Sequence, residues 1–580
     1  MSRLARGALW ALILAAALPA RADRGLAVVY VSSNVGMASG GHAALRADDA
    51  VYHLQNVDGG LLLLVREGWS SFRLVYAELQ NRPLEVAHIA TAPEVTEQVQ
   101  RAFARLYVQQ EMELARRDSL REDVAWLEAF ARADPPPPLR GAGLVAPERA
   151  GDPDATRLRM AVEAELGPGM LARIAAESEA RVAATGAASA DLRELREALS
   201  LREAVRALVL GYGLEPAAVA PLPAEIDAPL SRAERRALRQ LATGLERSTV
   251  ELLRSTRPDR GYALSLAEAR YLAARRSLSA NRLVVLDAFQ GSEVPEPVAE
   301  DVSDTVRAKW AAEAAELVRR GRESVLGEGR IEEDNLNLLE EAAAIAAREG
   351  RANAAGALSE YGLRKLPARA RSVQAAAATA DVGAALADAR ARLAEQDARL
   401  EANWGYNLVL RNCITELART TRGAFGSEAE AAAALGAEVP GPDEPLGFVP
   451  FVFFERVLDR LRIEQIDEFP NRRAEELESL LRESPGLWTT ARESTVPTST
   501  IYTPHLRDTA FLLFTDDVFW PRPLFGALNL AYGVGYSVYG AAAAPFDGGA
   551  RLHAGATGAM WSLPELAFVN VRKGSFDWKD

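Results

Sequence analysis

The chain contains one cysteine, Cys413, in 580 residues. A lone thiol cannot form an internal disulfide, so its presence needs another explanation. It follows Asn412, which is placed to cap a helix that continues through Ile414 and Leu417. Backbone N–H groups in the first turn of a helix favour a thiolate and can stabilise an oxyanion. We therefore predict that Cys413 is a nucleophile and that Asn412 caps its helix and supports an oxyanion.

A nucleophilic thiol needs a base, and the chain has five histidines. His42 and His53 lie in two short apolar segments, 42–47 and 50–55, that predict a β-hairpin with a two-residue turn at positions 48 and 49. In such a hairpin both side chains project from the same face, directly or diagonally opposed. A three-residue turn would instead place them on opposite faces. The two-residue turn predicts that one imidazole orients the other.

The other histidines lack a comparable setting. His88 lies in an apolar segment and is interpreted as a satisfied core residue, whereas His505 and His553 have no partner motif. One cysteine and two histidines leave the fourth ligand of a zinc site unidentified, so no metal is predicted. No cofactor is predicted either.

The elements that must position these residues form an α+β arrangement. Short apolar runs predict a small antiparallel sheet with strands at 26–32, 42–47, 50–55, 61–66 and 84–90. From about residue 93 to 403 the chain has helical periodicity, with breaks at 135–153, 216–229 and 290–303, and one long helix is expected over 369–402. These helices are interpreted as a solvated bundle, with a lid or a partner surface as the alternative.

The C-terminal part contains a second unusual segment. Residues 523–546 include no charged residue, and Gly526, Gly533 and Gly540 recur every seven positions. On a helix they would form a smooth strip, and tyrosines at 532, 536 and 539 would form an aromatic stripe. Contact with a membrane surface and burial as a glycine-rich hairpin both remain open, and a bilayer span is less favoured because the segment is weakly hydrophobic.

The N-terminus has the pattern of an export signal. Arg3 and Arg6 precede an apolar run at 8–18, and Ala20-Arg-Ala22 has the form of a cleavage site. We therefore expect an exported protein of the periplasm or cell envelope. The net charge of −13 argues against nucleic acid as a partner.

The residues around the proposed nucleophile and base resemble a known pattern. Gly41-His42, then His53 and a later Asn412-Cys413 that opens a helix, resemble the permuted NlpC/P60 papain-like superfamily and its lecithin:retinol acyltransferase-like branch. The chain is most similar to the Lnb-type lipoprotein N-acyltransferase family, named for its N-terminal periplasmic domain. Further residues that carry this resemblance are Tyr406-Asn407 and the tail segments 545–549 and 562–575. The long helical middle is poorly matched.

The resemblance implies a permuted papain-like core interrupted by a large helical insertion. It makes Cys413 the nucleophile, His42 the general base and acid, and His53 the orienting third residue. The domains expected from the sequence pattern and the resemblance are a signal peptide at 1–22, the β part of the papain-like domain at 23–92, the helical insertion at 93–403, the Cys413 helix and the rest of the catalytic domain at 404–510, and an apolar C-terminal segment at 511–580, for which membrane association is one of the two open alternatives.

The favoured function is a thiol acyltransferase that takes an acyl chain from a phospholipid and passes it to an amine, such as the N-terminus of a lipoprotein. The candidate acyl-chain contacts are Phe448, Phe451, Phe453 and Phe454. Two alternatives are a cysteine amidase or peptidase that acts on cell-wall peptides, and an envelope scaffold without enzymatic activity. The scaffold predicts an unreactive Cys413 that can be replaced without consequence.

Overall fold

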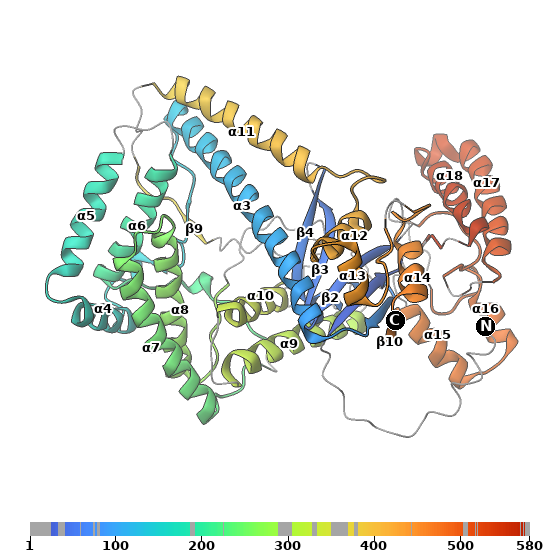
Figure 1. The fold of residues 1–580 in the computed structure, drawn as a ribbon, viewed down its shortest axis with the longest axis horizontal. Helices are drawn as coiled ribbons and strands as arrows, with labels where there is room; N and C mark the ends of the chain where they lie inside the picture. Colours follow the sequence, from blue (N-terminus) through green and yellow to red (C-terminus); the bar gives the residue numbers. More distant parts are fainter. Residues whose placement is uncertain are drawn as a thin grey trace.

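A computed structural model describes residues 25–32, 41–57, 60–73, 76–77, 82–185, 192–223, 226–287, 304–327, 333–349, 369–375, 381–441, 444–502, 508–516, 518, 520–568, 570–571 and 573–574. The expected signal peptide, the glycine-rich loop at 33–40 and His505 lie outside these residues. The described chain is an α+β protein, as predicted, in which helices surround one antiparallel sheet (Figure 1).

The central sheet has six strands in the order β10-β5-β1-β2-β3-β4, with every neighbouring pair antiparallel. Five of the strands confirm the prediction: β1 (Leu26–Val31), β2 (His42–Ala47), β3 (Ala50–Val57), β4 (Leu61–Gly68) and β5 (Leu84–Ile89). The sixth, β10 (Ile463–Phe469), comes from the far end of the chain and was not predicted. It is an edge strand in which four of the seven side chains are exposed and none is buried, so it lacks the apolar pattern that marks a buried strand.

The two faces of this sheet have different covers. One face packs against α3 (Pro93–Arg132), α12 (Cys413–Gly423) and α14 (Pro450–Arg460), with Leu45, Phe103 and Ile414 in the shared core. The other face carries Val29 and Val51 and packs against α2 (Trp69–Arg73) and the residues that follow it. Cys413 therefore belongs to a helix on the first face.

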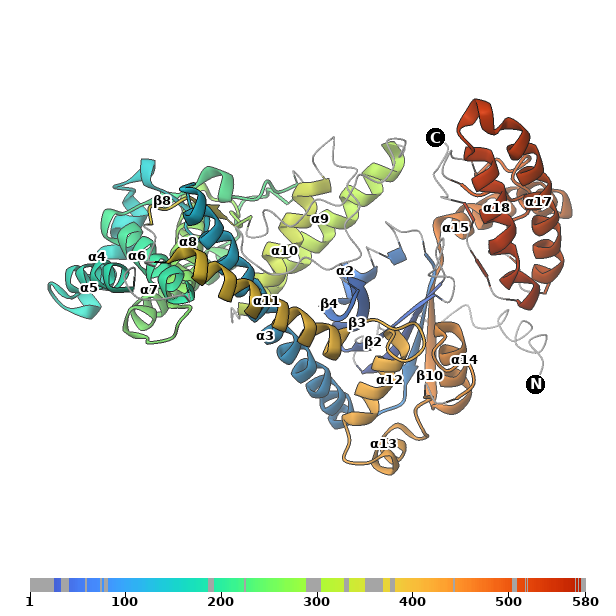
Figure 2. The ribbon, with the colours of Figure 1, turned by 90° about the horizontal axis from the view of Figure 1, so that it is seen from above.

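The helical insertion lies to one side of the sheet (Figures 1 and 2). Its elements are β6 (Leu139–Arg140), β7 (Val145–Ala146), α4 (Pro153–Leu166), α5 (Met170–Thr185), α6 (Arg193–Leu210), β8 (Gly213–Leu214), α7 (Arg232–Arg254), α8 (Arg260–Ala280), α9 (Asp304–Gly327), α10 (Glu333–Glu349), β9 (Ala370–Arg371) and α11 (Val382–Trp404). Helices α3 and α11 run side by side from the sheet to the group formed by α4–α8 (Figures 1 and 2).

The prediction of one long helix over 369–402 was wrong at its start. Residues 370 and 371 form β9, which pairs with β6, and the helix begins only at Val382. Asp381 accepts a hydrogen bond from the N–H of Ala384 and so caps the helix. The alanine-rich composition suggested that the helix begins at residue 369. The pairing of β9 with β6 and the cap at Asp381 instead delay its start to Val382.

The C-terminal part begins with α13 (Glu428–Leu435) and α14 on the sheet and continues through α15 (Arg472–Glu483) and α16 (Leu487–Glu493). It ends in a hairpin of α17 (Arg522–Asp547) and α18 (Ala550–Ser562) at the end of the molecule opposite α4–α8 (Figures 1 and 2). The helix predicted over the uncharged segment is confirmed. Within the described residues, no helix is long and apolar enough to cross a membrane.

Candidate active site

The β2–β3 hairpin brings His42 and His53 into contact. The register pairs Ala47 with Ala50 and Ala44 with His53, so the turn has two residues and His42 lies diagonally opposite His53 on the same face. Nε2 of His42 is 3.1 Å from Nδ1 of His53, and the rings are nearly perpendicular. The predicted same-face arrangement is confirmed.

Sequence reasoning missed a third member of this cluster, Glu67 near the end of β4. Its Oε1 lies 2.8 Å from Nε2 of His53, and the two side chains are only 6% and 0% exposed. Glu67 pairs in register with Val51 and shares the face of His53. The available signal was its strand parity, because an acid on a buried face requires a partner.

The three side chains form a directional relay when Glu67 is ionised. A carboxylate only accepts hydrogen bonds, so His53 donates from Nε2, and neutral His53 then accepts at Nδ1. His42 must donate its Nε2 hydrogen there, which leaves the lone pair of the His42 imidazole on Nδ1. Burial, assisted by His53 and Arg82, holds the pKa of His42 well below its usual value. The relay therefore ends in a neutral imidazole whose lone pair is on Nδ1.

Aromatic side chains fix the two imidazole rings. Tyr76 stacks on His42 with ring centroids 5.6 Å apart, and Phe72 meets the face of His53 edge-on at 5.1 Å. The hydroxyl of Tyr76 accepts a hydrogen bond of 2.8 Å from the Gln55 amide. This packing restricts ring rotation, which a tautomer-dependent relay requires.

Asn412 caps the cysteine helix as predicted. Its Oδ1 accepts hydrogen bonds from the N–H groups of Ile414 and Thr415, and the Thr415 hydroxyl accepts from the N–H of Asn412. The Asn412 side-chain amide donates to the carbonyls of Leu408 and Phe448 at 2.7 and 2.8 Å. Both amide hydrogens are engaged, so the expected oxyanion role does not fit the Asn412 side chain. The residue instead joins the helix to two neighbouring loops.

The surroundings of the Cys413 thiol differ from the sequence expectation in one respect. Burial raises its pKa to about 11, although the N–H groups of Ala43, Ile414 and Cys413 and the Arg82 cation each favour the thiolate. The N–H groups at the helix terminus favour the thiolate as predicted, but the cost of desolvation is larger, so the pKa is raised overall. Cys413 as a whole residue is of intermediate exposure.

The Cys413 thiol lies at the start of β2. The N–H of Ala43 points to the thiol, and Ala43 directly follows His42. The cysteine helix packs on one face of the sheet and the histidine rings on the other, so the first residues of β2 lie between the two groups. Among the described residues no hydrogen bond joins Cys413 to His42. Such bonds commonly form only in the substrate complex.

Arg82 is a second residue that sequence reasoning missed. Its Nε donates to the Ser32 carbonyl at 2.8 Å, and its guanidinium lies over the Tyr76 ring. The buried cation lowers the pKa of both His42 and Cys413. Arg82 therefore favours the thiolate form of Cys413 and disfavours the imidazolium form of His42. It lies between elements, without a motif that would mark it.

An exposed apolar loop directly precedes the cysteine helix. Leu408, Val409 and Leu410 are 54%, 49% and 71% exposed. Oδ1 of Asn407 accepts hydrogen bonds from the N–H groups of Val409 and Leu410, which holds the loop in a tight turn. The loop therefore presents three aliphatic side chains to the outside close to the thiol.

The four phenylalanines expected to contact an acyl chain divide into two pairs. Phe453 and Phe454 on α14 are 2% and 3% exposed and belong to the core against the sheet, with Phe454 stacked on Tyr30. Phe448 and Phe451 are half-buried. Core packing explains the burial of Phe453 and Phe454. Only Phe448 and Phe451 retain surface that a ligand can touch.

The remaining described histidines lie outside the cluster. Nε2 of His88 pairs with Asp467 on β10 at 2.9 Å, so His88 is satisfied as predicted, although it is partly exposed. His553 is an exposed residue of α18. No group of three or more metal-binding side chains occurs within the part of the chain that the structure describes.

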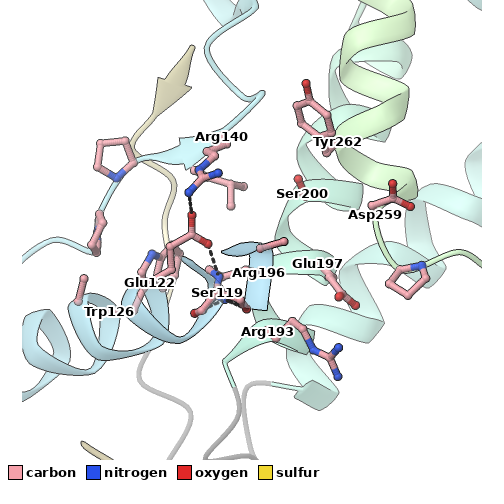
Figure 3. Close-up of a pocket in the computed structure, with 16 residues that line it drawn as sticks. Ser119, Glu122, Trp126, Arg140, Arg193, Arg196, Glu197, Ser200, Asp259 and Tyr262 are labelled. Carbon is pink, nitrogen blue, oxygen red and sulfur yellow. Dashed lines mark hydrogen bonds and ion pairs between the residues drawn. The ribbon is translucent and has the colours of Figure 1, made fainter. Parts of the chain in front are cut away.

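A large cavity of about 440 Å³ lies elsewhere, between α3, α6 and α8 (Figure 3). Its polar wall is a paired network in which Glu122 contacts Arg140 and Arg196, and Arg196 also donates to Ser119. No cysteine or histidine lines it. This cavity is separate from the Cys413 cluster and offers no nucleophile–base pair.

The fold and the cluster define an α+β protein with a carboxylate–imidazole–imidazole relay beside a cysteine at a helix N-terminus. Comparison with known proteins does not place it further: no family model, curated protein or solved structure matches the chain.

Proposed function

We propose that this protein is a cysteine-dependent acyltransferase of the cell envelope, built on a permuted papain-like core. The observation that carries the proposal is the Glu67–His53–His42 relay, which ends beside the helix of Cys413. A buried chain of two imidazoles and a carboxylate has no obvious packing purpose. It does fix the tautomer of a general base, which nucleophilic catalysis needs.

In the first half-reaction, Nδ1 of His42 accepts the thiol proton of Cys413 while the sulfur attacks an ester carbonyl of a phospholipid. The tetrahedral intermediate collapses, the ester C–O bond breaks, and His42 returns the proton to the departing lysophospholipid oxygen. The acyl chain then rests on Cys413 as a thioester.

In the second half-reaction, an amine such as a lipoprotein N-terminus attacks the thioester carbonyl. His42 accepts a proton from the amine nitrogen, the C–S bond breaks, and the thiolate takes the proton back. The product is an amide, and the thiol–imidazole pair is restored. No external oxidant, reductant or cofactor enters this balance.

The neutral resting state of the pair suits a site that waits for a lipid. The raised pKa of Cys413 and the lowered pKa of His42 keep both groups uncharged before substrate binds. A buried inert cysteine would also have a raised pKa, so this property alone does not indicate an enzyme. The histidine relay, which ends on the neighbouring strand β2, distinguishes the two cases.

The apolar loop at 408–410 favours a lipid donor over a cell-wall peptide. Aliphatic side chains that are exposed next to a nucleophile suit an acyl chain, whereas a peptide substrate calls mainly for hydrogen-bonding groups. We assign Leu408 and Leu410 as candidate acyl-chain contacts in place of the buried Phe453 and Phe454.

The test is to incubate the purified protein with an alkyne-tagged phospholipid and to measure label that hydroxylamine releases. The wild type should become labelled, and Cys413→Ala and His42→Ala should each lose the label while retaining the circular dichroism spectrum of the wild type. His553→Ala is the matched control, because His553 is exposed and outside the relay, and it should label normally.

Two outcomes would overturn the proposal. Release of cell-wall peptides by unlabelled, folded wild type would identify a cysteine amidase or peptidase. Full envelope function in a Cys413→Ala strain would identify a scaffold, for which the thiol is dispensable.

A further inference from the structure

The α17–α18 hairpin exposes an apolar surface that the catalytic proposal does not use. On α17 the exposed residues between positions 524 and 546 are all aliphatic, glycine, proline or aromatic, and none is charged. The large ones are Leu524, Leu528, Tyr532, Val534, Val538, Tyr539 and Phe546, with exposed fractions from 39% to 90%. At 100° per residue they occupy an arc of about 160° on one side of the helix.

The opposite side of α17 is already occupied. A side chain at Gly526, Gly533 or Gly540 would come within 2.6 Å of atoms in α18 or the turn after it. The glycine strip is therefore the contact that joins the two helices of the hairpin. It cannot also serve as a close-packing surface for a second copy of the chain.

The dimensions of the hairpin suit a position in the plane of a membrane surface. Its first helix, of 26 residues, is about 39 Å long, but α18 has only 13 residues and reaches about 20 Å, less than the roughly 30 Å of a hydrocarbon core. An in-plane helix buries only its apolar face at the boundary between headgroups and acyl chains. Tyrosines at 532 and 539 on the exposed face match the preference of that ring for the same boundary.

The hairpin also begins next to the candidate active site. Arg522, its first residue, lies close enough to the Tyr30 hydroxyl that each charge affects the pKa of the other group. Tyr30 in turn lies against Gly41, where an added Cβ would approach its ring within 2.6 Å. A hairpin that rested on a bilayer would therefore hold the start of β2 near the lipid surface.

We infer that the exposed face of α17, from Leu524 to Phe546, docks on the surface of a phospholipid bilayer as an in-plane anchor. The attraction is hydrophobic: the hairpin from Arg522 to Phe568 contains two arginines and two acids, so its formal charge is zero. The whole chain is acidic, at −13, and is repelled by anionic lipid. Binding should accordingly be stronger on zwitterionic vesicles than on anionic ones and should persist in high salt.

The test is co-sedimentation of the purified full chain with phosphatidylcholine–phosphatidylethanolamine vesicles in 0.1 M and about 1 M salt. The double variant Leu528→Asp/Val538→Asp changes only exposed positions and should weaken binding at least tenfold. The matched control, Met112→Asp/Met160→Asp, changes exposed residues of α3 and α4, outside the hairpin, and should bind like the wild type.

Three outcomes would overturn the inference: wild type that stays in solution, a double variant that binds unchanged, or binding that disappears in high salt. Analytical ultracentrifugation adds a fourth, in which the wild type is a dimer and the double variant a monomer with unaltered vesicle binding. That result would assign the face to a second copy. Cys413→Ala should bind vesicles normally, so the anchor and the catalytic proposal can fail independently.

Discussion

The sheet end that carries His42 and the cavity between α3 and α6 both contain buried polar clusters, but the clusters are organised differently. In the cavity wall, Arg196 is surrounded by the carboxylates of Asp123 and Glu122 and the hydroxyl of Ser119. Glu122 also pairs with Arg140, so the charges of this network meet opposite charges. In the sheet cluster, Glu67 orders His53, and His53 orders His42, whose basic nitrogen then remains available.

The difference distinguishes a structural cluster in the cavity wall from a cluster on the sheet that is arranged to transfer a proton. A closed set of ion pairs stabilises the position of two helices and has no reason to react. An ordered row that ends in an unengaged lone pair has a direction, and this row runs from Glu67 on β4 through His53 to His42, the first residue of β2. The cavity is the larger feature, yet the smaller cluster has the chemistry.

The largest effect is expected for Glu67→Gln, which should reverse the order of hydrogen-bond donors and acceptors in the relay. An amide can donate to Nε2 of His53, which would move the His53 proton to Nδ1 and reverse both imidazoles. His42 would then present N–H instead of a lone pair to the thiol. We expect the rate of acyl-enzyme labelling to fall by about 100-fold or more. Quantitative labelling with the tagged phospholipid measures it.

The structure provides a control for that substitution on the same sheet. Asp467→Asn alters the carboxylate partner of His88, a histidine–carboxylate pair with similar geometry that lies outside the relay. It should label at the wild-type rate. Equal losses in the two variants would show that labelling responds to sheet stability and not to the relay.

The second effect is on stability and concerns the cavity cluster. Asp123→Ala removes a carboxylate that is 2% exposed and leaves the nearly buried Arg196 cation short of one partner. We expect the free energy of unfolding to fall by about 3 kcal/mol, measured by urea denaturation. Labelling of the folded fraction should be unchanged.

An exposed ion pair tests whether burial is the reason for the loss of stability expected in Asp123→Ala. Glu177→Ala removes an exposed partner of Arg173 and should change stability little. A loss of labelling rate in folded Asp123→Ala would mean that the two clusters are coupled and that the cavity cluster is not purely structural.

The third effect follows from the raised pKa of Cys413. Because burial sets that pKa at about 11, the thiol is protonated at neutral pH and the thiolate fraction rises about tenfold per pH unit below 11. Alkylation of the free protein by iodoacetamide should rise steeply between pH 7 and 10. A rate that is already constant below pH 7 would indicate a thiolate–imidazolium ion pair, contrary to the directions of both pKa shifts.

The local features of the site could be predicted from sequence because they depend on near neighbours. Strand alternation and a two-residue turn were enough to place His42 and His53 on one face, and Asn412 marked the start of the cysteine helix. The glycine strip of α17 followed from helical spacing alone. None of these depends on a distant segment.

The features that escaped prediction depend on contacts between distant parts of the chain. Strand β10 joins its partner β5 from far along the chain, and His88 and Asp467, whose side chains are hydrogen-bonded although 379 positions apart, gave no local sign of the pairing. The partnership of Glu67 with His53 needs the β3–β4 register. The high pKa of Cys413 reflects how completely the surrounding elements displace water, which no motif encodes.

The smallest expected effect concerns a hydroxyl on the cavity wall. The Tyr262 oxygen is buried without a hydrogen-bond partner among the described residues, and burial raises its pKa. If the cavity cluster is purely structural, Tyr262→Phe removes an unpaired polar atom and should raise the free energy of unfolding by up to about 1 kcal/mol. Tyr532→Phe, at an exposed position, should have no effect on urea denaturation. A clear loss of stability in Tyr262→Phe would show that the hydroxyl binds a partner in solution. The cavity cluster would then resemble the relay, because each would have a polar group, the Tyr262 hydroxyl or His42 Nδ1, that is available to a partner from outside the cluster.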